Sequence, residues 1–178
     1  MDKLITPQEF TTFRNVGNKF DPKKIGEAIE QAQSDLREIM GNPFFFDVMK
    51  NHTSPEYTDL MAGSEYTEGT YLMMHNGIKS LLADLTYARY IYEINTTLTP
   101  FGAVTKTHGD SAPVSHSMIK DLVKQTRIDS DKNWQLIEGY LEVNKDTFPV
   151  WASQNSCNTS NNNGSFQQTR FTFLSTGK

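Results

Sequence analysis

The sequence predicts a mainly α fold: a helical bundle with two long helices, a small β-hairpin and a C-terminal strand on a polar tether. Apolar residues recur at helical spacing in three stretches, which Gly, Pro and Asn separate. The length of 178 residues suits one domain. We therefore expect a helical domain over residues 1–152, followed by a tether and strand arm over residues 153–178.

The N-terminal part carries two helix start signals. Thr6 to Glu9 has the form of a capping box with proline at the first helical position, which predicts a short helix to about Phe13. Asp21-Pro22 repeats the signal, and Gly41 ends the second helix. This helix should cover one side of the core with a single apolar face, made of Ile25, Ala28, Ile29, Ala32, Leu36, Ile39 and Met40.

Shorter elements follow. Asn42-Pro43 and Ser54-Pro55 each have the form of a cap and a first-turn proline, which predicts short helices over Phe44 to Met49 and Glu56 to Met61. Between Tyr66 and Met74 the residues favour β structure on either side of a Glu-Gly turn, which predicts a small hairpin.

The next two helices are long. Asn76 can cap a helix that is apolar over much of its circumference, so it should be the central one; its stripe is Ile78, Leu81, Leu82, Leu85, Tyr87, Ala88, Tyr90, Ile91 and Tyr92. Ser115 can cap a helix to about Val143, some 28 residues and roughly 42 Å long. We expect it to project or to bend near Asp129 to Asp131. Its apolar face is Ile119, Leu122, Val123, Thr126, Trp134, Ile137 and Leu141.

These faces define a predicted core. We expect burial of Ile25, Ile29, Leu36, Leu81, Leu82, Leu85, Ile119, Leu122 and Ile137. The clusters Phe44 to Phe46 and Met73-Met74 are also expected to fill the core, with Phe45 facing away from its two neighbours. An exposed aromatic there would mark a contact surface. The tyrosines of the central helix could form a stacking platform for nucleic acid, but core packing explains them better.

Two segments are candidate interfaces. Thr96 to Val114 is a long connection without expected secondary structure, and such loops are usually functional or ordered by a partner. Phe166 to Leu174 is strand-like and follows a polar tether, so its backbone must pair with the body or with a neighbour. The interface residues predicted from these segments are Thr99, Pro100, Phe101, Val104, Phe166, Arg170, Phe171 and Phe173.

Composition excludes several function classes. The chain has 17 Lys and Arg against 21 Asp and Glu, and the Lys and Arg residues are scattered along the sequence. This distribution disfavours tight binding to the phosphate backbones of nucleic acids. The N-terminus lacks a signal-peptide pattern and no apolar run approaches roughly 20 residues, so we expect no membrane association. The single cysteine, Cys157, has no local histidine to activate it and is expected to be an inert thiol.

No motif of a phosphate loop, dinucleotide fold, zinc protease or nucleophile elbow is present, so we expect a protein that is not an enzyme and needs no cofactor. Two groupings are weak candidates for chemistry. His108, Asp110 and His116 have metal-ligand side chains at a spacing that matches no common site, so we expect no metal. Glu65 and Glu68 near His75 could do acid–base work, but solvated carboxylates are the better interpretation.

Several segments in this order resemble the head–tail connector or head-completion (adaptor) proteins of tailed bacteriophages, particularly those of crAss-like and other Bacteroidota phages. The resemblance covers about residues 3–152. The segments that carry it are Leu4 to Phe10, Ile25 to Gly41, Gly77 to Leu82, Leu85 to Tyr90, Thr99 to Val104, Tyr140-Leu141 and Phe148 to Trp151.

The resemblance implies a structural virion protein in the phage neck. Its subunits, commonly twelve, would form a ring beneath the portal protein, contact downstream neck or tail proteins, and line or surround the channel through which DNA passes without specific binding. The family has no catalytic residues. The acidic balance of this chain is consistent with such a channel, because a wall that held phosphates would retard DNA.

Two other functions stay open on the residues alone. One is a small helical binding or regulatory protein; the other is an enzyme with an unrecognised site around His108 and His116. Size under native conditions separates the first from a ring protein, and metal analysis tests the second.

Overall fold

The computed structural model describes residues 3–16, 21–99, 102–105 and 115–156. It is mainly helical with two small hairpins. The elements in chain order are α1 (Pro7–Phe13), α2 (Pro22–Met40), α3 (Asn42–Asn51), the 3-10 turn η1 (Pro55–Tyr57), α4 (Thr58–Ala62), β1 (Ser64–Glu68), β2 (Tyr71–His75), α5 (Gly77–Asn95), β3 (Thr96–Thr99), β4 (Gly102–Thr105), α6 (His116–Val143) and α7 (Pro149–Ser156).

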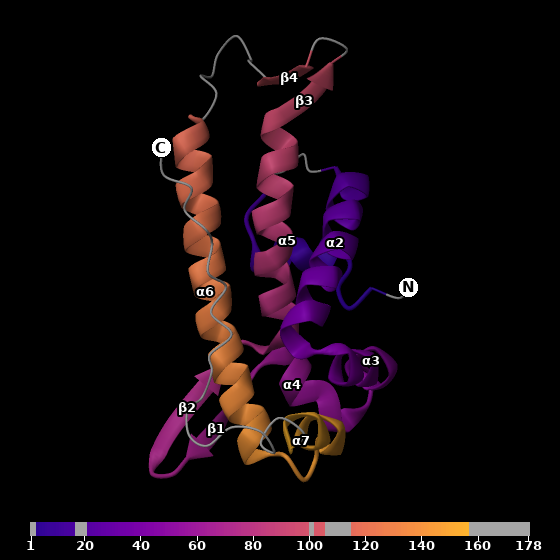
Figure 1. The fold of residues 1–178 in the computed structure, drawn as a ribbon, viewed down its shortest axis with the longest axis vertical. Helices are drawn as coiled ribbons and strands as arrows, with labels where there is room; N and C mark the ends of the chain where they lie inside the picture. Colours follow the sequence, from indigo (N-terminus) through magenta and orange to yellow (C-terminus); the bar gives the residue numbers. More distant parts are fainter. Residues whose placement is uncertain (1–2, 17–20, 100–101, 106–114, 157–178) are drawn as a thin grey trace.

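Three long helices form the body of the molecule. In Figure 1, α5 runs between α2 and α6, and the short elements α3, α4, α7 and the β1–β2 hairpin gather at one end, opposite the β3–β4 hairpin. Helix α5 is buried on nearly all sides from Gly77 to Ile91, as its apolar circumference predicted. The mainly α prediction with a small hairpin is therefore confirmed.

Three of the predicted helix caps are confirmed by hydrogen bonds, whereas Asn42 is the first residue of α3 and not its cap, and the side chain of Ser54 makes no capping bond. The Glu9 N–H donates to Thr6 Oγ1 at 3.1 Å, and the Thr6 N–H donates to the Glu9 carboxylate at 2.8 Å, which completes the capping box. The Asp21 carboxylate accepts from the Lys23 N–H at 3.0 Å, and Ser115 Oγ accepts from the Met118 N–H at 3.3 Å.

Of the nine core positions predicted from the helical faces, all but one are buried. Leu122 is 40% exposed, whereas the other eight residues are buried. The buried stripe of α6 is narrower than we expected and includes three polar residues, Thr126, Ser130 and Asn133. The hydroxyls of Thr126 and Ser130 each donate to the carbonyl four residues earlier, at 2.9 Å, which satisfies them inside the core.

Helix α6 runs as one continuous element through Asp129 to Asp131, and it lies beside α5 (Figure 1). A buried stripe along the whole length of α6 explains why 28 residues fit a small domain: α5 covers the stripe in the first half, and the β1–β2 hairpin covers it in the second half. No helix within the described ranges combines the length and the apolarity that a bilayer span requires.

Two predicted boundaries are wrong. The expected loop Thr96 to Val114 begins with an antiparallel hairpin, in which Thr96 to Thr99 pair with Gly102 to Thr105. Consecutive threonines favour strand structure, and the Pro and Gly residues between them suit the turn. Residues 106–114 lie outside the described part.

The expected tether at 153–178 begins too early, because α7 continues to Ser156. Gln154 anchors this last turn: its Nε2 donates to the Met40 carbonyl at 2.8 Å, and its Oε1 accepts from the Phe44 N–H at 3.3 Å. The domain boundary at residue 152 therefore cuts a helix. The remaining tether and the expected strand at 166–174 lie outside the described residues.

Candidate assembly surfaces

The β1–β2 hairpin packs its inner face on the second half of α6. The register pairs Ser64 with His75 and Tyr66 with Met73, so these side chains share the face toward α6. The ring of Tyr66 meets that of Tyr140 edge to face at 5.9 Å. A Cβ at Gly139 would lie 2.5 Å from the Tyr66 hydroxyl, so the missing side chain at this position lets the hairpin close on the helix.

The outer face of the same hairpin exposes two large apolar side chains. Thr67 pairs with Leu72 and Glu65 with Met74 on this face, where Leu72 is 69% and Met74 60% exposed. Tyr71, at the start of β2, is 73% exposed. The expectation that Met73-Met74 fill the core is thus wrong for Met74, because strand alternation sends the two side chains to opposite faces.

A groove lies where this outer face meets the helices. It has a volume of about 370 Å³, and its lining includes Phe13 of α1, Ala62 of α4, Met74 and Glu65 of the hairpin, and Ser80 of α5. Phe13 is 38% exposed, so the groove has an apolar side chain on each of two walls. Exposed apolar side chains of this kind are common at sites of protein or ligand contact.

Behind the groove lies a buried polar site around His75. This side chain is 1% exposed, and its Nε2 lies 3.2 Å from Ser64 Oγ. The Tyr140 ring stacks on the imidazole at 4.5 Å between centroids. Burial lowers the pKa of His75, while the carboxylate of Asp59 raises it by a smaller amount. The imidazole is therefore neutral at pH 7.

The acid–base grouping predicted around His75 does not form. Glu65 lies on the outer face of the hairpin and Glu68 at its far end opposite Tyr71, whereas His75 points inward. A nucleophilic serine needs a histidine whose other nitrogen is oriented by a third group. Nδ1 of His75 has no hydrogen-bond partner among the described residues, so the Ser64–His75 pair lacks that group.

The predicted metal grouping is only partly visible. His116 is exposed at the first position of α6, and His108 and Asp110 lie outside the described residues, as does Cys157. In the part of the chain that the structure describes, no three His, Cys, Asp or Glu side chains gather as metal ligands.

The two predicted interface residues that the structure describes lie at one end of the molecule (Figure 1). Thr99 pairs with Gly102, and Val104 pairs with Thr97, in the β3–β4 hairpin at the end away from β1–β2 (Figure 1). The other predicted interface residues, Pro100, Phe101, Phe166, Arg170, Phe171 and Phe173, lie outside the described residues.

Two further exposed apolar positions were missed by sequence reasoning. Phe46 is 51% exposed while Phe44 and Phe45 are buried, so the prediction that Phe45 faces away is wrong. Helical rotation places positions 44, 45 and 48 on the core side of α3. Met118, at the start of α6, is 61% exposed. Helical periodicity counted from the buried Ile119 could have found Met118.

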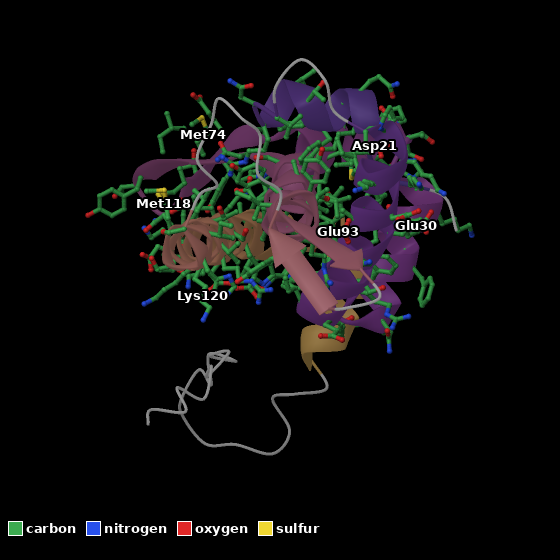
Figure 2. The ribbon with its side chains drawn as sticks, turned by 90° about the horizontal axis from the view of Figure 1, so that it is seen from above. Asp21, Glu30, Met74, Glu93, Met118 and Lys120 are labelled. Carbon is green, nitrogen blue, oxygen red and sulfur yellow. The ribbon has the colours of Figure 1, made fainter. Side chains whose placement is uncertain are left out.

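The two sides of the molecule are formed by different elements, α6 and the β1–β2 hairpin on one side and α2 on the other (Figure 1). Viewed along the long axis in Figure 2, Met74, Met118 and Lys120 lie on one side, and Asp21 and Glu30 lie on the other. Glu30 forms an ion pair with Lys3 at 3.0 Å.

No curated protein and no solved structure matches this chain. A family of unknown function, DUF6712, matches residues 36–161. The matched span holds both hairpins, α5, α6 and α7, and therefore the groove apart from its α1 wall. Because the match covers more than half of the 178 residues, the chain belongs to the family of unknown function DUF6712.

Proposed function

We propose that this chain is a structural, non-enzymatic protein of the bacteriophage virion that forms a ring in the neck between the portal protein and downstream tail components. The ring lines or surrounds the DNA channel without binding DNA specifically, and the subunit is made in the host cytoplasm before it is incorporated. This proposal rests on the resemblance of residues 3–152 to head–tail connector proteins and on the surface that the fold exposes.

The observation that supports it best is the apolar outer face of the β1–β2 hairpin. Leu72 and Met74 are 69% and 60% exposed on a hairpin whose other face is packed on α6. Large exposed apolar side chains of this kind mark protein contacts. The fold would bury them when a neighbouring subunit or neck protein covers this end of the molecule.

The charge of the chain also suits a channel. Its formal net charge is -4, and the exposed bases Lys120 and Lys124 share α6 with Asp121 and Asp129. Mixed charge gives weak, salt-sensitive attraction to phosphates in place of a tight site. DNA can then slide past such a wall.

The test is assembly on the portal. The full chain is mixed with the portal protein encoded by the same genome, and the products are sized and imaged by negative-stain electron microscopy. We expect a ring of this chain on one face of the portal. A chain that stays unbound at every ratio tested contradicts the proposal.

A pair of variants tests whether the β1–β2 hairpin contributes to that assembly. Replacing both apolar residues (Leu72→Ser with Met74→Ser) should weaken ring formation at least tenfold, because the contact loses its apolar area. Thr67→Ala, on the same outer face, should leave assembly unchanged. Helical circular dichroism shows that each variant is folded.

A further inference from the structure

The groove beside the β1–β2 hairpin has features that select a particular occupant. Its apolar walls are Phe13 on α1 and Met74 on β2, and Ser64, Asn76 and Ser80 supply polar groups along its length. In the described part of the chain, β1 and β2 form a sheet of two strands, so the outer edge of each strand has backbone groups without a partner strand. An extended segment with apolar side chains on one side fits such a place.

The surroundings of the groove are acidic. Between Lys50 and Lys79 the sequence has no Lys or Arg, whereas it has Asp59, Glu65 and Glu68, all exposed. Glu65 lines the groove, and its side chain makes no hydrogen bond or ion pair with another described residue. A positively charged segment is therefore the favoured occupant.

The chain itself contains a segment with both properties. Beyond α7, residues 157–178 carry two bases, Arg170 and Lys178, and no acid. Within them, Phe166 to Leu174 has the composition of a strand, and as a strand it would place Phe171 and Phe173 on one side, two residues apart.

The segment also begins close enough to reach the groove. Helix α7 ends at Ser156 at the same end of the molecule as the β1–β2 hairpin (Figure 1). The nine residues between Ser156 and Phe166 span about 30 Å when extended and about 17 Å as a flexible coil. Both lengths exceed the radius of gyration of about 16 Å expected for 178 residues, so the segment can reach a groove beside the hairpin at the same end of the molecule.

We propose that the segment Phe166 to Leu174 docks in this groove. Phe171 and Phe173 cover the side chains of Phe13 and Met74, the segment's backbone pairs with an open hairpin edge, and its one base, Arg170, lies near Glu65. The docked segment thereby covers Met74 and leaves Leu72, which does not line the groove, exposed for the assembly contact. This inference does not depend on the ring, since the groove and the segment belong to the same sequence.

The experiment locates the segment in the full chain. The single cysteine is removed (Cys157→Ser), a new one is introduced by Thr172→Cys, and a nitroxide is attached to it. The methionine methyl groups are labelled with carbon-13 and assigned through Met74→Leu and Met118→Leu. Met74 and Met118 are matched probes, being 60% and 61% exposed.

We expect the nitroxide to broaden the Met74 methyl resonance strongly and to leave that of Met118 sharp. Met118 is distant because the hairpin contacts α6 around Asn133 to Tyr140, 15 or more residues and so about 22 Å or more along the helix. Equal broadening of both resonances, or none at Met74, overturns the proposal.

Two variants of the labelled chain test the chemistry of docking. Phe171→Ser with Phe173→Ser should abolish the broadening at Met74, and Glu65→Lys should reduce it severalfold. Asp121→Lys makes the same charge change on the exposed face of α6 and should leave the broadening as it was. If Glu65→Lys and Asp121→Lys change the broadening equally, the segment does not bind in the groove. Failure of ring assembly leaves these resonances unaffected, so the two proposals fail separately.

Discussion

Leu85 shows how a single apolar side chain contributes to this fold. It lies on α5, belongs to the main core cluster and is 8% exposed. Leu85→Ala should lower the free energy of unfolding by about 2 to 5 kcal/mol, because the truncated side chain leaves a cavity. Leu122→Ala, at the exposed position on α6, should cost under about 0.5 kcal/mol. Urea unfolding measures both, and a loss below about 0.5 kcal/mol for Leu85→Ala would show that α5 buries another face.

His75 gives the fold a pH dependence of known sign. Burial lowers its pKa below the ordinary value of about 6.5, so below that pH the unfolded chain takes up a proton before the folded chain does. Stability from this residue is complete above about pH 6.5 and is lost as the pH falls through the folded pKa.

We predict that the wild type and the His75→Phe variant differ in how their stability depends on pH. The urea midpoint of the wild type should fall more steeply from pH 7 to pH 5 than that of His75→Phe, which cannot take up a proton at this position. Ser64, Tyr66, Tyr140 and Asp59, which surround the imidazole, are the same in both chains. Parallel curves would mean that the imidazole is already accessible to water in the folded state.

Asp84 is another buried residue with an ionisable side chain. Burial raises the pKa of its carboxyl, and the Arg14 guanidinium beside it opposes that shift; the Arg14 Nε–H donates to the carboxylate at 2.8 Å. The pair joins the end of α1 to the middle of α5. Neither residue belonged to any predicted grouping, because 70 positions separate them and no local pattern connects them.

At the scale of elements, the C-terminal helix decides where the folded domain ends. A chain that ends at Ser156 keeps the Gln154 bonds to the Met40 carbonyl and the Phe44 amide, which hold α7 against the α2–α3 corner. A chain that ends at Ala152 loses them and leaves two buried backbone groups unpaired.

We therefore expect thermal melting by circular dichroism to distinguish the two truncations. The chain ending at Ser156 should melt close to the full chain, and the chain ending at Ala152 should melt several degrees lower, since each lost bond costs about 1 kcal/mol. Gln154→Ala in the full chain should reproduce most of that decrease. Equal melting of the two truncations would refute the anchoring role of Gln154.

Elements with strong local signals could be predicted from the sequence. The capping residues Thr6, Asp21 and Ser115 gave correct helix starts, because a cap acts on N–H groups within three residues. The β1–β2 hairpin was also correct. Its exposed outer face was missed, since alternation shows that Met73 and Met74 face opposite ways but not which face meets α6.

The remaining errors have the same physical origin. Leu122 and Phe46 are apolar residues at the margin of a helical stripe, and whether such a residue is buried depends on the width of the neighbouring element. The β3–β4 hairpin was overlooked because its strands are only four residues long. Gln154 lies in a polar stretch whose composition is typical of a tether. Its anchoring role depends on the hydrogen bond to the Met40 carbonyl at the α2–α3 corner, which the sequence does not show.

At the scale of the whole molecule, the proposed ring gives the two ends different tasks. The end with β1–β2, α3 and α7 carries the groove and exposes Leu72 and Met74, while the β3–β4 hairpin with Thr99 and Val104 stands at the other. A subunit seated between a portal and a tail component meets one partner at each end. The two sides of the subunit, which are formed by different elements (Figure 2), would then contact each other between neighbours in the ring.

The central claim is that the chain belongs to the phage neck, and imaging of particles tests it most directly. Particles produced by the genome that encodes the chain are purified, labelled with antibodies against it and viewed by electron microscopy. We predict label at the head–tail junction, at a single vertex of each capsid. Particles with no label there, or label spread over the capsid or the distal tail, would contradict the account.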